Sequence, residues 1–147
     1  MSASRLLTAF AGDAGYAIQD GDGMLIVTDQ ETNDEFELIV AEDSVAIRQP
    51  YAVEELSDAG AAMCLELMSN LNNRFTCCKQ CFDEERNIVT ICDVPGQVAS
   101  SELIKAMLLQ VQFVAHATYP LFAQVLDGGA IPNEDAIDAA FENPELS

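Results

Sequence analysis

The chain has 147 residues, half of them hydrophobic, which is enough for one domain with a buried core that needs no disulfides. Its 25 acidic and 6 basic residues give a formal net charge of −19, so nucleic acid and anionic membrane surfaces are excluded as expected partners. No apolar run approaches the roughly 18 residues of a membrane span. The apolar run after Arg5 is too short for a signal peptide, so we expect a cytoplasmic protein with reduced cysteines.

The first third of the chain predicts a short helix followed by three short strands. Leu6, Leu7 and Phe10 share one face of a helix over residues 4–11. After it, short runs of apolar residues, in part alternating with polar ones, are separated by polar turns, which is typical of an antiparallel meander. We predict its strands over residues 24–28, 35–40 and 44–49, with Pro50 ending the last one.

A helix and a second hairpin follow in the middle of the chain. Apolar residues recur with helical spacing between residues 53 and 74, and Asn72 and Asn73 mark the end of that helix. The polar DEER turn then separates two strands, which we expect over residues 74–82 and 87–94.

A long helix over residues 102–126 is apolar around much more than one stripe. Ser100 or Ser101 caps it, and Pro120 is expected to kink or split it. A helix of this kind is buried on two sides, and we expect the second side to contact another subunit. The predicted residues of this dimer interface are Met107, Val111, Val114, Leu121 and Phe122.

These elements predict an α+β fold in the order α-β-β-β-α-β-β-α, with a three-strand meander and a hairpin in an antiparallel sheet packed with helices. We assign residues 1–126 to one domain and residues 127–147 to an acidic tail. The tail either forms one short helix, with Asn133 as its cap and Ile137 and Phe141 on one face, or is loose.

The stretch RFTCCKQCF, residues 74–82, holds three of the five cysteines. If this stretch is a strand, Cys77 and Cys81 share one face and Cys78 lies on the other. A structural zinc site needs four convergent ligands, and the sequence offers neither a second cysteine pair nor a histidine pair. We therefore expect buried, reduced thiols that pack as small apolar residues, without a metal ion or another cofactor.

Pairing across the DEER turn leaves one question of register open. Either Cys77 or Cys78 lies opposite Cys92, so a disulfide is geometrically possible, although the cytosol keeps such a pair reduced. A metal or redox site built on Cys77, Cys78, Cys81 and Cys92 is therefore the alternative interpretation.

Other chemistry is weakly indicated. DGDG at residues 20–23 resembles the start of a calcium loop, but Met24 stands where the next ligand belongs, so we expect a hairpin turn. The only histidine, His116, lies with Lys105 and Gln112 on the more polar side of the long helix. No nucleophile can be placed beside it, so we predict no catalytic residues and no enzyme activity.

The order of elements, together with SNLNNRFTCCKQCFDEERNIVTICDVP at residues 69–95, resembles the class I type III secretion chaperones and the related YbjN-type bacterial proteins, which are regarded as regulators of sensory transduction. The resemblance covers about residues 4–126. It implies an α+β fold, a homodimer, no enzyme activity and the binding of an extended segment of a partner protein. The cysteine-rich hairpin and the tail depart from the family pattern.

Two functions follow from this reading. The first is a non-catalytic, dimeric protein-binding module, acting as a regulator or chaperone of a bacterial partner protein. The second is a thiol-based metal or redox sensor built on the cysteine-rich hairpin. The predicted alternation of the strand favours the first, because it separates the thiols.

Overall fold

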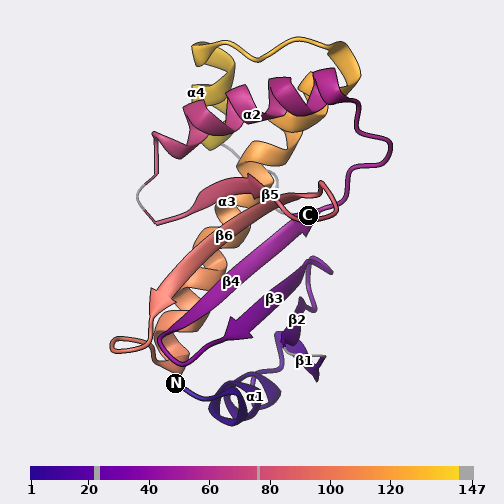
Figure 1. Ribbon diagram of the computed structural model, residues 1–147. Helices are drawn as coiled ribbons and strands as arrows, with labels where there is room; N and C mark the ends of the chain where they lie inside the picture. The colour runs from indigo at the N-terminus through magenta and orange to yellow at the C-terminus, as the bar shows by residue number, and fades with distance from the viewer. Residues whose placement is uncertain (22–23, 76, 143–147) are drawn as a thin grey trace.

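The computed structural model describes residues 1–21, 24–75 and 77–142. The strands of these ranges form one antiparallel sheet, which is packed with helices (Figure 1). The predicted α+β fold class is therefore confirmed. The elements are α1 (Ala3–Ala11), β1 (Tyr16–Asp20), β2 (Leu25–Asp29), β3 (Glu35–Val40), β4 (Ser44–Tyr51), α2 (Asp58–Asn72), β5 (Lys79–Phe82), β6 (Ile88–Pro95), α3 (Ser101–Gly128) and α4 (Glu134–Glu142).

The sheet has the strand order β1-β2-β3-β4-β6-β5. The predicted meander is present, and β1 extends it by a strand that the sequence analysis missed, because only Tyr16 and Ile18 of β1 are even half-buried. β4 continues through Pro50 to Tyr51 instead of ending at the proline, and Pro50 lies opposite Val89 of β6. The DGDG turn predicted at residues 20–23 includes residues 22–23, which lie outside the described residues.

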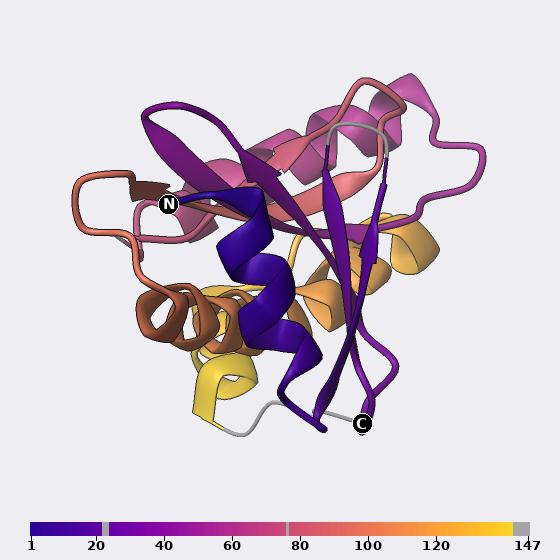
Figure 2. The same cartoon turned by 90° about the horizontal axis from the view of Figure 1, so that it is seen from below.

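The helices lie on one side of the sheet. α1 packs against β1 and β2, and α3 runs behind β4 and β6 in the view of Figure 1. Figure 2 shows α1 beside the first half of α3, and the Lys105 ammonium joins them by hydrogen bonds to the Ala9 carbonyl and the Asp13 carboxylate, both at 3.1 Å. Inward-facing residues of the strands fill the space beneath, among them Val27, Phe36 and Ile47.

Most of the apolar surface of α3 is buried within the chain itself, and this corrects the predicted dimer interface for four of its five residues. Val111 and Val114 pack into the core under the sheet, whereas Leu121 and Phe122 pack into a second core with α2 and α4. These four side chains are at most 3% exposed, so they are not available to another subunit. The interface prediction is wrong for them; Met107 is half-buried and lines a surface pocket.

α3 looks apolar all round because its buried face changes along its length. Its first half faces the sheet and α1, and its second half faces α2 and α4. Ser100 caps it by accepting from the Leu103 N–H, and Pro120 lies on an exposed side without splitting the helix. Gly129 ends it with a φ of +64°, in the left-handed region that glycine favours. In the described ranges, no helix combines the length and apolarity needed to cross a membrane.

The helical alternative predicted for the tail is confirmed by α4. The Asn133 side chain accepts a hydrogen bond from the Ala136 N–H, and Ile137 is buried in the core with α2 and α3. Arg74 fastens α4 to the end of α2 through ion pairs with Glu134 and, at 2.7 Å, with Asp138. The boundary expected at residue 126 falls inside α3, and α4 belongs to the packed fold up to Glu142.

The start of the second hairpin differs from the prediction. α2 begins only at Asp58, after its cap Ser57, and β5 begins at Lys79 instead of Arg74. The Asn72 side chain accepts from the Gln80 N–H at 2.7 Å and donates to the Gln80 carbonyl at 2.9 Å. The end of α2 thus satisfies the backbone of Gln80 in the short edge strand β5.

Candidate functional site

Cys77 and Cys78 lie in the irregular segment that precedes β5. Their exposures alternate as predicted, since Cys77 is exposed and Cys78 is buried. Their sulfur atoms are nevertheless only 3.9 Å apart, because the backbone here is not a strand. The inference that alternation separates these two thiols is therefore wrong. Thr76, in the same predicted strand, lies outside the described residues.

Cys92 brings a third thiol to the same place. β5 and β6 pair Lys79 with Ile91, so Cys78, directly before β5, and Cys92, directly after Ile91, are the next residues at that end of the pairing. Of the two registers left open by the sequence, the structure has the one with Cys78. The interaction between the Cys78 and Cys92 thiols raises the pKa of Cys78 and lowers that of Cys92. We call Cys77, Cys78 and Cys92 the thiol cluster.

The other two cysteines lie apart from the thiol cluster. Cys81 is exposed and belongs, with Arg48 and Ile91, to the opposite face of the sheet. Cys64 is buried in the core between α2 and α3, where desolvation raises the pKa of its thiol. Within the described ranges, no three His, Cys, Asp or Glu side chains are grouped so that they could hold a metal ion. The four cysteines named for the alternative function thus divide into a cluster of three and the separate Cys81.

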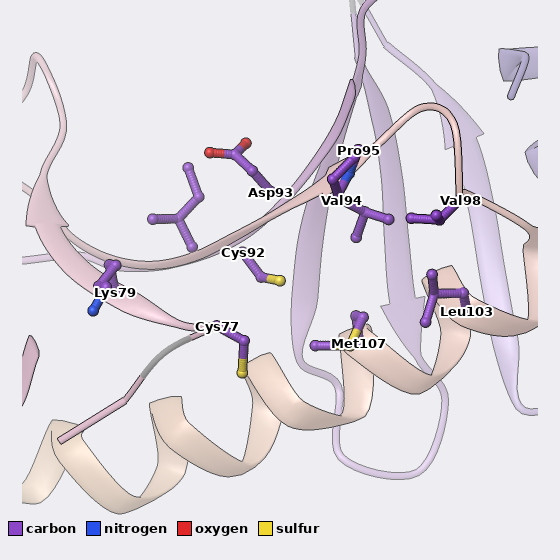
Figure 3. Close-up of a pocket in the computed structure, with 10 residues that line it drawn as sticks. Cys77, Lys79, Cys92, Asp93, Val94, Pro95, Val98, Leu103 and Met107 are labelled. Atoms are coloured by element: carbon purple, nitrogen blue, oxygen red, sulfur yellow. The ribbon is translucent and has the colours of Figure 1, made fainter. Parts of the chain in front are cut away.

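A pocket of about 490 Å³ opens beside the thiol cluster, between β6, the loop that follows it, and the first turns of α3. Figure 3 shows the sulfur atoms of Cys77 and Cys92 on its wall, with Met107 and Leu103 of α3 facing them. Val98, in the loop, closes one end and is 61% exposed. The lining residues are Cys77, Lys79, Ile91, Cys92, Asp93, Val94, Pro95, Val98, Leu103 and Met107.

The pocket wall is mainly apolar, and its two charged residues, Lys79 and Asp93, are both exposed. The Lys79 ammonium donates to the carbonyls of Asn72 and Phe75, at 2.7 and 2.5 Å, so it is held against the backbone. An apolar wall of this kind, without a paired acid and base, suits the binding of an apolar group. Sequence reasoning missed this pocket because its walls come from residues 77–107, which become neighbours only through the β6–α3 connection.

His116 is part of a polar network that fastens α3 to the β2–β3 turn. Its Nε2 atom lies 2.6 Å from the Asp34 carboxylate, and the Gln112 amide donates to Asp34 at 2.8 Å and to Asp29 at 3.0 Å. Burial raises the pKa of Asp29, but the hydrogen bonds from Gln112 and from backbone N–H groups outweigh it, so the pKa is lowered overall. His116 is thus a hydrogen-bonded structural residue.

Neither a protein-family model nor a curated protein sequence matches this chain.

Proposed function

We propose that this chain is a non-catalytic protein-binding module that holds an apolar segment of a partner protein in the β6–α3 pocket. The observation that carries the proposal is Val98, a large apolar side chain left 61% exposed at the end of a pocket with apolar walls. Exposed apolar groups rimmed by polar ones are typical of interaction sites. Leu103 and Met107 present further apolar surface to the same pocket.

The charge of the chain indicates the chemistry of the occupant. The chain has a formal net charge of −19, and of the two charged residues on the pocket wall Lys79 is held against backbone carbonyls whereas Asp93 contributes a carboxylate. A segment with apolar residues at its centre and Lys or Arg on both sides matches this surface. We therefore propose a basic-flanked apolar segment as the occupant, and an acidic one as disfavoured.

The element order supports a module of the YbjN or secretion-chaperone type, acting in the cytoplasm as a regulator or chaperone of a bacterial partner protein. The core of the predicted order is present, with a meander, a helix, a hairpin and a long helix. β1 and α4 are additions to that order. These features bear on the fold, and the pocket supplies the argument for binding.

The binding proposal can be tested with two labelled peptides of about 12 residues that share a Leu- and Phe-containing centre and differ in their flanks, Lys in one and Glu in the other. Fluorescence anisotropy should show the Lys-flanked peptide binding at least tenfold more tightly at low salt. Val98→Glu should weaken its binding at least tenfold, the size of loss found at central interface residues.

Leu65→Glu is the matched control, because Leu65 is 55% exposed on α2 and does not line the pocket. It adds the same charge and should bind like the wild type. If both variants lose the same affinity for the Lys-flanked peptide, the added charge alone explains the loss. If Val98→Glu binds this peptide as tightly as the wild type, the pocket is not the binding site.

We also propose that the chain is a homodimer, now through the face of the sheet that carries no helix in the described ranges. Ile26, Ile39 and Ile91 are half-buried there. Arg48 and Glu37 are paired across β4 and β3 on the same face, and the Arg48 Nε atom lies 3.7 Å from the Glu37 Oε1 atom. In a twofold dimer the same patch meets itself, so each arginine can also reach the partner's glutamate at the same position.

Light scattering coupled to gel filtration tests the dimer at micromolar concentration. The wild type should have about twice the chain mass of 15.9 kDa. Ile39→Lys should give the mass of a single chain, because the charged side chain cannot be buried between two copies. Leu109→Lys, on the exposed side of α3, is the control and should stay dimeric. A wild type of 15.9 kDa under these conditions would contradict the dimer.

A further inference from the structure

The thiol cluster combines one accessible thiol with two buried ones, of which Cys78 directly precedes β5 and Cys92 lies in β6. Cys77 is exposed, whereas Cys78 and Cys92 are buried in the core under the sheet. Cys78 is the central member, because its sulfur lies 3.9 Å from that of Cys77 and its side chain is buried in the same core cluster as that of Cys92. Packing alone does not require three of the five cysteines of the chain to meet in this way.

We propose that the thiol cluster is a peroxide-responsive switch, in which oxidation enters at Cys77 and ends as a disulfide between Cys78 and Cys92. The exposed sulfur is the one that a dissolved oxidant reaches first. Cys78 is the nearest thiol to it, and Cys92 is the thiol that Cys78 reaches next.

The chemistry has three balanced steps. The Cys77 sulfur attacks a peroxide oxygen, the O–O bond breaks, and Cys77 becomes a sulfenic acid with release of water. The Cys78 thiol then attacks the sulfur of this sulfenic acid, which forms a Cys77–Cys78 disulfide and releases a second water. Finally the Cys92 thiol gives up its proton and attacks the Cys78 sulfur, which forms the Cys78–Cys92 bond and breaks the Cys77–Cys78 bond; the departing Cys77 thiolate takes up a proton and is again a thiol. Two thiols lose two electrons in all, and one peroxide gains them.

The geometry favours the final product over the intermediate. Cys78 and Cys92 adjoin the Lys79–Ile91 pair, and paired residues of antiparallel strands have Cα atoms about 4.5–5.5 Å apart, within the range that a disulfide spans. Adjacent cysteines close a small, strained ring, which drives exchange towards the pair that lies across the strands.

The switch would alter the neighbouring pocket, an effect that rests on the proposed function. Figure 3 shows the Cys92 sulfur on the pocket wall in the reduced protein. In the disulfide this sulfur is bonded to Cys78, which does not line the pocket. We therefore expect oxidised protein to bind the Lys-flanked peptide with an affinity that differs at least threefold from that of reduced protein.

The disulfide is tested without any partner, so its failure is distinct from a failure of the binding proposal. Reduced full-length protein is treated with hydrogen peroxide, blocked with a thiol reagent under denaturing conditions, digested and mapped by mass spectrometry. The wild type should keep three of its five thiols, including Cys77, and yield a peptide linked through Cys78 and Cys92. Dithiothreitol should restore all five.

Two variants and one control make the assignment specific. Cys77→Ser should form the same disulfide at least tenfold more slowly, because the remaining two thiols are buried. Cys92→Ser should stop at the Cys77–Cys78 intermediate or at more highly oxidised Cys77. Cys81→Ser, which removes the other exposed thiol, should behave like the wild type. The proposal is overturned if wild-type Cys77 becomes sulfinic acid while Cys78 and Cys92 stay free, or if the only disulfides join two chains.

Discussion

Replacing Phe122 with alanine is expected to lower the free energy of unfolding by about 3–5 kcal/mol, the usual range for deleting a fully buried phenylalanine. Phe122 has no exposed surface and packs with Leu67 and Leu71 of α2 and with Ile137 of α4. Its loss leaves a cavity at the junction of three helices. Urea unfolding followed by circular dichroism measures the change.

The dependence on protein concentration distinguishes a core residue from an interface residue. If Phe122 belongs to the core of each chain, the difference between variant and wild type stays constant when the protein concentration changes tenfold. Leu109→Ala on the same helix is the control, since Leu109 is 52% exposed, and we expect a change within about 0.5 kcal/mol. A small effect of Phe122→Ala, or one that grows on dilution, would return this residue to an interface.

The second large effect is expected at Asp34. Its carboxylate accepts hydrogen bonds from Gln112 and, at 2.9 Å, from the Thr32 hydroxyl, and it lies against His116. Asp34→Ala removes this acceptor from the Thr32 hydroxyl, from His116 and from Gln112, which keeps Asp29 as an acceptor. We therefore expect the free energy of unfolding to fall by about 2–3 kcal/mol, the range for hydrogen bonds to a charged group. Urea unfolding at pH 7 provides the measurement.

Removing any carboxylate also makes the net charge of this acidic chain less negative, so the control variant must lose a carboxylate as well. Glu35 follows Asp34 directly, is exposed and has no side-chain partner among the contacts of the described residues. Glu35→Ala should leave the stability unchanged or raise it slightly, because self-repulsion falls. If the two variants behave alike, the network around Asp34 contributes nothing beyond charge.

Much of the fold could be predicted because its local signals are strong. The alternation in β3 places Phe36 and Leu38 inward, and both are fully buried. Ser100 caps α3 as expected, and the DEER turn separates β5 from β6. The sequence analysis did not predict β1, because its side chains face solvent or are only half-buried and therefore show no clear apolar pattern. Backbone pairing with β2 joins it to the sheet.

The sites were harder to predict because they depend on what lies between elements. The two apolar faces of α3 indicated a second subunit, yet α2 and α4 cover one of them within the same chain. We predicted that the thiols lie apart because we took residues 74–82 to be one strand. In the structure the Asn72 side chain is hydrogen-bonded to the backbone of Gln80 in β5, and β5 does not extend back over Cys77 and Cys78. Neither the packing of α2 and α4 on α3 nor the contact between Asn72 and Gln80 can be predicted from the local periodicity of the sequence.

The central claim is that an apolar, basic-flanked segment binds in the β6–α3 pocket. The most direct measurement is methyl NMR of the full chain during titration with the Lys-flanked peptide. The largest shift changes are expected on the methyl groups of Val94, Val98, Leu103 and Met107, which line the pocket. Shift changes confined to Ile26, Ile39 and Ile91 on the opposite face of the sheet, or saturating binding that leaves the pocket methyl groups unmoved, would contradict it.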